Sequence, residues 1–374
     1  MPASRPRLIL GMSSGTSADA VDLALVKITG SRQERKIEVL EAMEMPFEPS
    51  LQQRVHAFIQ KYDLPLAQLD RDISFFFSDC ANIFLEKFGY LNSDLDCIAS
   101  HGQTVFHHDG DPTQGSLQLG DIQLMADRCG APVIGNFRQA DLHQGGQGAP
   151  ISVFADWVLH GEIEDTVAIL NLGGIANISL LRLSQPPMAW DCGPANGPLD
   201  ALIRKNSAEK CDLGGEIALS GKRDQNLFEE LVQHPYFSAE LPKSTGLELF
   251  GPKWVDDICD RFPDVSLEDM LATLCGIVGY SVSSSLKMAP EYPRFIYCCG
   301  GGRHNLALMC ALRAALPDVV IRDYSELGFD ADLREAMAFA LLGDAFLLGE
   351  VSTWPTTTGG KKSSILGNVV HPCT

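Results

Sequence analysis

The sequence has few basic residues for its length. Its 374 residues include 29 Lys and Arg against 48 Asp and Glu, a formal net charge of −19. A protein that wraps nucleic acid needs a broad basic face, and an anionic membrane surface repels an acidic chain. We therefore expect neither nucleic acid nor a membrane as a partner. An anionic ligand must be held by a few local donors rather than by the field of the whole protein.

Long apolar runs are missing as well, and none approaches the ~20 residues that a membrane-spanning helix needs. The strand-like segment that begins at Arg7 leads directly into Gly11, Ser13 and Ser14, so we expect no signal peptide. The 11 cysteines include no Cys-x-x-Cys pair, which disfavours a zinc knuckle or a disulfide framework. We expect a cytoplasmic protein whose thiols are mostly small buried apolar groups.

Several well-known nucleotide and protease motifs are also absent. There is no Gly-x-x-x-x-Gly-Lys-Ser/Thr loop, no Gly-x-Gly-x-x-Gly and no His-Glu-x-x-His, which disfavours the P-loop, Rossmann and zincin classes. Residues 11–15 do match the Gly-x-Ser-x-Gly nucleophile elbow. That elbow needs several preceding strands and a following helix, whereas a second strand is expected here. We favour instead a turn whose N–H groups and hydroxyls face an anion.

What is present is a strand–glycine turn–strand pattern that occurs twice, over residues 7–28 and 166–183. A third apolar strand, 294–299, breaks at Gly300, Gly301 and Gly302 and leads into a helix. Apolar residues recur at helical spacing over 51–90 and in four later segments, which are 151–160, 266–288, 305–316 and 332–348. A single core rarely exceeds ~250–300 residues. The pattern therefore predicts an α/β protein with two sheet-centred lobes.

Two carboxylates are candidates for chemistry. Asp191 lies at an expected strand end beside Gly193, where it is either a catalytic group or a turn and helix cap. Glu335 lies on an apolar helix, where it is either a pocket acid or a helix-end residue with a satisfied partner.

The histidines His101, His107 and His108 lack a matching set of further ligands, so a loop is favoured over a metal site. His101 alone, which begins a polar segment expected to be a loop, is a candidate polar contact to a ligand. The turn-rich stretch 135–150 is a plausible domain junction.

Within this pattern, eight segments in order make the chain resemble the anhydro-N-acetylmuramic acid kinase family of the sugar kinase/Hsp70/actin superfamily. They are MSSGTSADAVD at 12–22, HGQT at 101–104, NFR at 136–138, GGQGAP at 145–150, NLGGIANI at 171–178, DCGPAN at 191–196, KSTG at 243–246 and CGGGRHN at 299–305. The resemblance runs from about residue 8 to the end of the sequence.

The resemblance implies a two-lobed, RNase H-like α/β fold with the active site in the interdomain cleft. One lobe would comprise residues 1–140 with a C-terminal segment of about 350–374, and the other residues 141–349. The family uses ATP, with Mg²⁺, and water to open the 1,6-anhydro ring of 1,6-anhydro-N-acetylmuramic acid and phosphorylate O6. Its members recycle peptidoglycan and are usually homodimers. The alternatives are another sugar kinase of the superfamily or a non-enzymatic actin- or Hsp70-like ATP-binding protein.

The resemblance also assigns roles to single residues. Asp191 matches the catalytic base, and Glu335 matches an acid near the sugar. The residues expected to contact ATP are Gly15, Thr16, Ser17, Ala18, Asp19, Ala20, Val21, Asp22, Gly173, Gly174, Gly193, Gly300, Gly301, Gly302 and Asn305. Those expected to contact the sugar are Ser13, His101, Gln103, Thr104, Arg138 and Lys243.

The sequence departs from the family at two of these positions. Ala20 replaces a family glycine, and it would be strained if that glycine serves for its positive φ. Ser13 stands where many superfamily kinases place a magnesium-holding Asp, which leaves the metal ligands unassigned.

Overall fold

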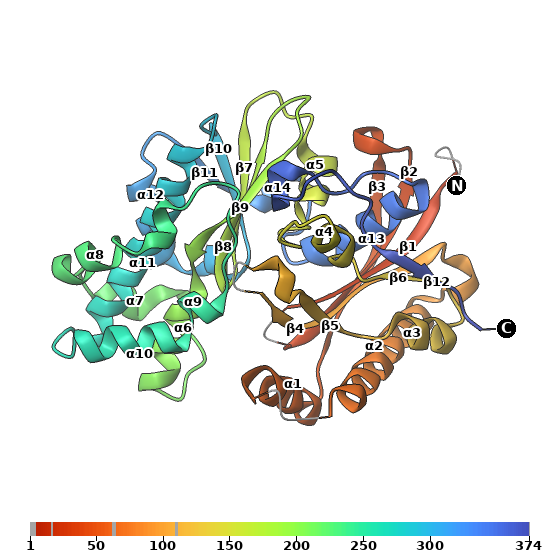
Figure 1. Ribbon diagram of the computed structural model, residues 1–374, viewed down its shortest axis with the longest axis horizontal. Coiled ribbons are helices and arrows are strands. Elements are labelled where there is room, and N and C mark those ends of the chain that lie inside the picture. Colours follow the sequence, from red (N-terminus) through yellow and green to blue (C-terminus); the bar gives the residue numbers. More distant parts are fainter. Residues whose placement is uncertain (1–4, 16–17, 62–64, 109–110, 374) are drawn as a thin grey trace. The chain divides into compact units, whose positions relative to one another are not determined.

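The computed structural model describes residues 5–15, 18–61, 65–108 and 111–373 (Figure 1). It forms two compact units: unit 1 contains the chain up to Leu159 and again from Leu333, and unit 2 contains His160–Asp332. The boundaries thus lie near 160 and 333 rather than at the expected 140 and 350. The helix Arg334–Leu348 belongs to unit 1 because it packs directly on the first strand, where a Cβ on Gly11 would lie 2.0 Å from the Ala336 carbonyl oxygen.

Unit 1 is built on one sheet with the order β12-β6-β4-β1-β2-β3, and β5 pairs with β4. The strands are β1 (Arg7–Ser14), β2 (Ala20–Thr29), β3 (Lys36–Pro46), β4 (Cys97–His107), β5 (Ser116–Leu119), β6 (Val133–Gly135) and β12 (Asn368–Val370). The helices are α1 (Pro49–Lys61), α2 (Leu66–Phe88), α3 (Ile122–Cys129), α4 (Gln139–His143), α5 (Val153–His160), α13 (Arg334–Leu348) and α14 (Pro355–Thr358). Strands β1 and β2 are apolar and buried over most of their length, as expected for a sheet covered on both faces.

Unit 2 has a five-stranded sheet with the order β11-β10-β7-β8-β9. The strands are β7 (Val167–Leu172), β8 (Ile175–Leu181), β9 (Met188–Pro194), β10 (Phe295–Cys299) and β11 (Val320–Asp323). The helices are α6 (Asn196–Asn206), α7 (Glu216–Ser220), α8 (Gln225–Leu231), α9 (Leu247–Phe250), α10 (Pro252–Arg261), α11 (Leu267–Met288) and α12 (Leu306–Ala315).

The two sheets share one topology. In each, three antiparallel strands follow one another, and the first of them pairs in parallel with a fourth strand that in turn pairs in parallel with a fifth. In unit 1 these strands are β1, β2, β3, β4 and β6, and in unit 2 they are β7, β8, β9, β10 and β11. The repeated arrangement confirms the expected α/β fold of the sugar kinase/Hsp70/actin type.

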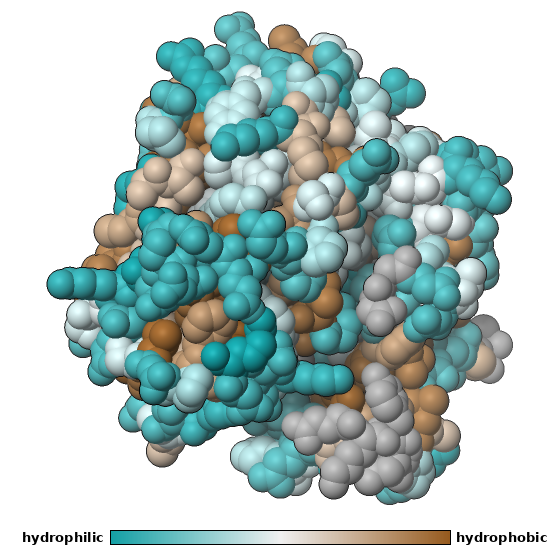
Figure 2. Space-filling view, turned by 60° about the vertical axis from the view of Figure 1, so that its left-hand side comes forward, coloured by the Kyte–Doolittle hydropathy of each residue, from teal (hydrophilic) through white to brown (hydrophobic). Residues whose placement is uncertain are grey.

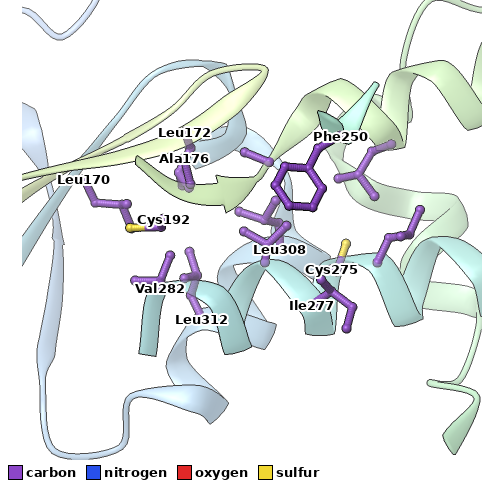
Figure 3. Close-up of a cluster of buried hydrophobic side chains, with 14 of the residues drawn as sticks. Leu170, Leu172, Ala176, Cys192, Phe250, Cys275, Ile277, Val282, Leu308 and Leu312 are labelled. Carbon is purple, nitrogen blue, oxygen red and sulfur yellow. The ribbon is translucent and has the colours of Figure 1, made fainter. Parts of the chain in front are cut away.

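The core of unit 2 lies between its sheet and the helices α11 and α12. Figure 3 shows Leu170 and Cys192 of the sheet with Val282 of α11 and Leu312 of α12, all of them buried. The helix α11 begins where the sequence predicts it, because the Ser266 hydroxyl accepts a hydrogen bond from the Asp269 N–H. The face drawn in Figure 2 is mostly hydrophilic, as the high net charge leads one to expect.

Two sequence predictions need correction. The strand β4 does not end in a loop at His101 but continues to His107, because Gln103, Thr104, Phe106 and His107 pair with β5. The stretch 135–150 is not a domain junction, since it lies within unit 1. In the part of the chain that the structure describes, no helix has the length and apolar character needed to span a bilayer.

Candidate active site

Asp191 lies on β9 of unit 2, next to an irregularity in the sheet. The pairing of β8 with β9 shifts so that Asn177 is opposite Asp191 and Ala176 is opposite Gly193, leaving Cys192 as an extra residue. Such bulges turn side chains out of the regular alternation and are frequent beside active sites. Gly193 has φ +146°, and a Cβ there would approach Phe237 to 3.0 Å. This backbone therefore fixes the direction of the Asp191 side chain.

A loop after α8 holds the Asp191 carboxylate. Its Oδ2 accepts a hydrogen bond from the Thr245 N–H at 2.9 Å and another from the Ser244 hydroxyl at 3.1 Å. The Asp191 N–H donates to the Lys243 carbonyl at 2.9 Å, and the Tyr236 hydroxyl donates to the Asp191 carbonyl at 2.8 Å. Asp191 is only 7% exposed. The two donors fix the orientation of this carboxylate oxygen.

Lys243, which the resemblance places at the substrate, forms hydrogen bonds within its own loop. It is buried, and its Nζ donates to the carbonyl oxygens of Tyr236 at 2.8 Å and Phe237 at 3.3 Å. Burial lowers the pKa of Lys243. Burial, followed by the nearby Asp191, raises the pKa of Tyr236. In this structure Lys243 therefore stabilises the loop that holds Asp191.

The glycine-rich loops of unit 2 meet at the end of β7. The turn Gly173–Gly174 accepts hydrogen bonds from the N–H groups of Asn196, at 2.9 Å, and Gly197, at 3.0 Å. The Asn196 amide donates to the Leu172 carbonyl at 2.9 Å, and a Cβ on Gly302 would lie 2.7 Å from the Leu172 Cβ. The structure thus brings together three predicted segments that are far apart in the sequence.

The three glycines at 300–302 are not equivalent. Gly300 has φ +77°, and a Cβ there would clash with Asn171 at 2.5 Å. A Cβ on Gly301 would meet only the Asn196 amide nitrogen, at 4.0 Å. Gly300 and Gly302 serve close packing, and Gly301 leaves space beside the loop. Asn305 caps α12, because its Oδ1 accepts from the Leu308 N–H at 3.0 Å, so this predicted ATP contact has a structural partner.

In unit 1, the end of β1 contacts β4 through side chains. The Ser14 hydroxyl donates to the Gln103 Oε1 at 2.7 Å, and the Gln103 amide donates to the Gly15 carbonyl at 3.0 Å. The buried Ser13 hydroxyl has no hydrogen-bond partner among the described residues. A buried hydroxyl without a partner is costly unless a ligand or water completes it. The predicted contacts Thr16 and Ser17 lie outside the residues that the structure describes.

The rest of the first turn explains the departure at Ala20. This residue begins β2, and the positive φ in the turn, +50°, belongs to Ala18. Ala20 is therefore not strained. Asp19 accepts a hydrogen bond from the Gln52 amide at 2.9 Å. Val21 is buried in β2, and Asp22 lies directly opposite Ser13.

Arg138, His101 and His107 form a further group of polar side chains in unit 1, the Arg138 cluster. The Arg138 Nε donates to the His101 Nε2 at 3.2 Å, and the His101 ring stacks on Phe339 with the centroids 4.5 Å apart. Burial, followed by Arg138, lowers the pKa of His101 well below its usual range. Burial, Arg138 and His108 lower the pKa of His107 to about 3. Both imidazoles are therefore neutral at pH 7, and Arg138 supplies the positive charge.

The remaining predicted residues of unit 1 have simpler positions. Glu335 is exposed in the first turn of α13, and Thr104 accepts from the Gln118 amide at 3.3 Å. Among the described residues, no group of three His, Cys, Asp or Glu side chains is placed to hold a metal ion. Two supporting residues were not among the predicted contacts: Asn196, the last residue of the segment DCGPAN, and Tyr236, which precedes the segment KSTG. Only the fold reveals their contacts.

The family model described as anhydro-N-acetylmuramic acid kinase matches residues 7–372. A protein of that name from Gloeobacter violaceus is 36% identical over 376 residues, which cover 98% of this chain and 99% of the relative. A protein with the same name from Haemophilus influenzae is 34% identical, and the match covers 98% of each chain. Another, from a Shewanella species, is 37% identical, and the match covers 96% of this chain and 97% of the relative. A solved ROK family glucokinase from Streptomyces griseus is 12% identical, with a TM-score of 0.39 over 90% of this chain and 98% of its own.

Proposed function

The chain belongs to the anhydro-N-acetylmuramic acid kinase family, and on that premise we propose that it opens and phosphorylates 1,6-anhydro-N-acetylmuramic acid with ATP and water. The products are N-acetylmuramic acid 6-phosphate and ADP. The observation that supports this chemistry most directly is the buried Asp191 carboxylate, oriented by Thr245 and Ser244 at a sheet bulge. The enzyme is accordingly an ATP-dependent carbohydrate kinase, which we place in the cytoplasm and expect to be a homodimer.

In the proposed reaction Asp191 is the general base. It takes a proton from water, and the water oxygen attacks C1 of the sugar while the C1–O bond of the bridge breaks. The bridge oxygen stays on C6 and forms the new bond to the γ-phosphorus of ATP as ADP leaves. Glycoside hydrolysis ordinarily requires an acid for the leaving oxygen as well as a base for water. Here the leaving oxygen bonds to the γ-phosphorus instead of taking a proton from an acid, so one base is sufficient.

The glycine-rich loops are proposed to bind the nucleotide. Gly301 leaves space beside the end of β10, and Gly173 and Gly174 form the turn after β7. In unit 1, the segment from Gly15 to Asp22 is proposed to face the phosphates. Mg²⁺ accompanies ATP in such kinases. Because Ser13 stands where many superfamily kinases place a magnesium-holding Asp, phosphate oxygens and water would supply most of its ligands. Bound there, the ion would neutralise phosphate charge.

The Arg138 cluster of unit 1 is proposed to bind the sugar. Its lactyl carboxylate is anionic, and Arg138 offers a guanidinium that His101 orients at 3.2 Å. The unpartnered Ser13 hydroxyl, together with Gln103 and Thr104, is proposed to contact sugar hydroxyls. Glu335 is proposed as an acid near the sugar.

Labelled water tests the function and separates it from its alternatives. In H₂¹⁸O, the label should appear in the oxygen bound to C1 of the product and should be absent from the phosphoryl group. The product must be measured before this oxygen exchanges with solvent. A sugar kinase that phosphorylates a free hydroxyl would incorporate no water oxygen into either product. An ATP-binding protein that only hydrolyses ATP would place the label in inorganic phosphate. Label in the phosphoryl group, or ring opening without ATP, would overturn the proposal.

A further inference from the structure

Asp141 on α4 is a fully buried carboxylate that the proposed reaction does not use. Its Oδ2 accepts a hydrogen bond from the Gly148 N–H at 2.8 Å. Its Oδ1 accepts from the Thr358 hydroxyl at 2.6 Å, with the Thr353 hydroxyl at 3.4 Å. Burying a charge is costly unless donors surround it. Asp141 is therefore held in place by both a neighbouring loop and the distant C-terminal segment.

The loop after α4 is shaped around this carboxylate. A Cβ on Gly146 would lie 2.2 Å from the Asp141 Oδ2, so only glycine lets the backbone pass so closely. Gly148 has φ +70°, a conformation that glycine adopts without strain. The Gln147 N–H donates to the Thr358 carbonyl at 2.8 Å, which fastens the loop to α14. The loop conformation is thus set by Asp141 and Thr358 together.

The same loop orients Arg138. The Gly148 carbonyl accepts a hydrogen bond from the Arg138 Nη1 at 2.7 Å, while the Gly148 N–H is bound by Asp141. A single residue therefore joins the buried carboxylate to the guanidinium. Any change in the Gly148 backbone would rotate the carbonyl that holds Arg138. A separate contact of the guanidinium, from Arg138 Nε to His101 Nε2 at 3.2 Å, is made to the strand β4.

We propose that Asp141 and Thr358 are positioning residues for substrate binding, which act through Gly148 to hold Arg138 in the orientation that receives the sugar carboxylate. The inference rests on the proposed function of Arg138. It assigns the C-terminal segment, more than two hundred positions from Arg138, a part in substrate recognition rather than in folding alone. Ordered partners of this kind limit the loss of side-chain freedom on binding.

The test compares two neighbouring buried threonines of α14. The Thr358 hydroxyl donates to Asp141, whereas the Thr357 hydroxyl donates to the Trp354 carbonyl at 2.7 Å. Thr358→Val should raise the KM for 1,6-anhydro-N-acetylmuramic acid roughly three- to thirtyfold, the range for partners of this kind. Its kcat should change by less than about twofold, because uniform binding is lost without loss of chemistry. Thr358→Ser keeps the hydroxyl and should restore the KM. The matched control Thr357→Val should leave the KM unchanged.

A double-mutant cycle separates failure of this inference from failure of the proposed function. In the Arg138→Ala background, Thr358→Val should have no further effect on KM, since it acts through the missing guanidinium. Additive effects, or equal KM changes in Thr357→Val and Thr358→Val, would overturn the positioning role. If Arg138→Ala itself leaves the KM unchanged in an active enzyme, the proposed substrate contact is at fault instead. Asp141→Asn, which removes the charge at constant size, should shift the KM in the same direction as Thr358→Val.

Discussion

The backbone N–H of Thr245 points at the carboxylate of Asp191, 2.9 Å from Oδ2, although 54 positions separate the two residues. A backbone donor has no side-chain freedom to lose, so it fixes an acceptor at little entropic cost. The contact depends on the loop of Tyr236 and Lys243, whose hydroxyl and ammonium groups bond backbone carbonyls. The proposed base is therefore set by the fold before substrate binds.

Asp191→Asn should fold normally and lose turnover by roughly 10²–10⁴-fold, the contribution of a general base. An amide oxygen still accepts the Thr245 hydrogen bond, so the loop is expected to persist, but an amide does not take a proton from water. Release of ADP measures turnover, and the thermal midpoint serves as the folding control. Turnover near that of the wild type in a folded variant would remove Asp191 from the mechanism.

Gly301→Val should weaken ATP binding far more than it lowers stability, because the added side chain enters the space that we assign to the nucleotide. Gly302→Val is the matched comparison, since its Cβ would lie 2.7 Å from the Leu172 Cβ. That variant should lower the thermal midpoint. Calorimetric titration with ATP checks the first expectation. Unchanged ATP affinity in Gly301→Val would mean that these glycines serve packing alone.

Stability should decline in acid partly because of His107. Burial, Arg138 and His108 lower the pKa of His107 to about 3, against 6.5 for the unperturbed group. Above pH 6.5 its contribution is fully present; as the pH falls from 6.5 towards 3, only the unfolded chain takes up the proton, and the contribution is lost. Between pH 6.5 and about 3, His107→Gln should therefore reduce the number of protons taken up on unfolding by about one. Denaturation at several pH values measures this, with the exposed His143→Gln as control. An equal pH dependence in both variants would contradict the assignment.

Asp344→Asn should strongly destabilise the protein. Its carboxylate pairs with Arg7 and accepts from the Arg35 Nε at 2.7 Å, and all three side chains are 0% exposed. Arg35 keeps the Glu350 carboxylate at 2.8 Å, but the variant removes the charge that the two buried guanidinium groups share, and breaking a buried pair typically costs about 3–5 kcal/mol. The exposed Lys27–Glu38 pair, at 3.1 Å, offers the comparison, and Glu38→Gln should cost at most about 1 kcal/mol. Urea unfolding measures both changes, and similar losses in the two variants would refute the argument.

The sequence alone determined the local helices and strands and the strand–glycine turn–strand pattern that occurs twice. Strands apolar on both faces, glycine turns and the Ser266 cap are signals read within a few residues, because backbone conformation responds to near neighbours. The same signals identified Asp191 at its strand end. They failed where strand pairing extends an element, as at His101, which β5 keeps within β4.

Only the tertiary structure decided what the polar side chains do. Lys243 was expected at the substrate, yet its ammonium group bonds two carbonyls of its own loop. Asp141 lies in a turn-rich stretch that predicts a junction, and its partner Thr358 is 217 positions away. No local pattern encodes such a pair, because hydrogen-bond geometry between distant segments is set by how the core packs them together. The sequence identifies which residues are chemically able to act. The packing of distant segments decides which of these residues are oriented for the reaction and which ones only position their neighbours.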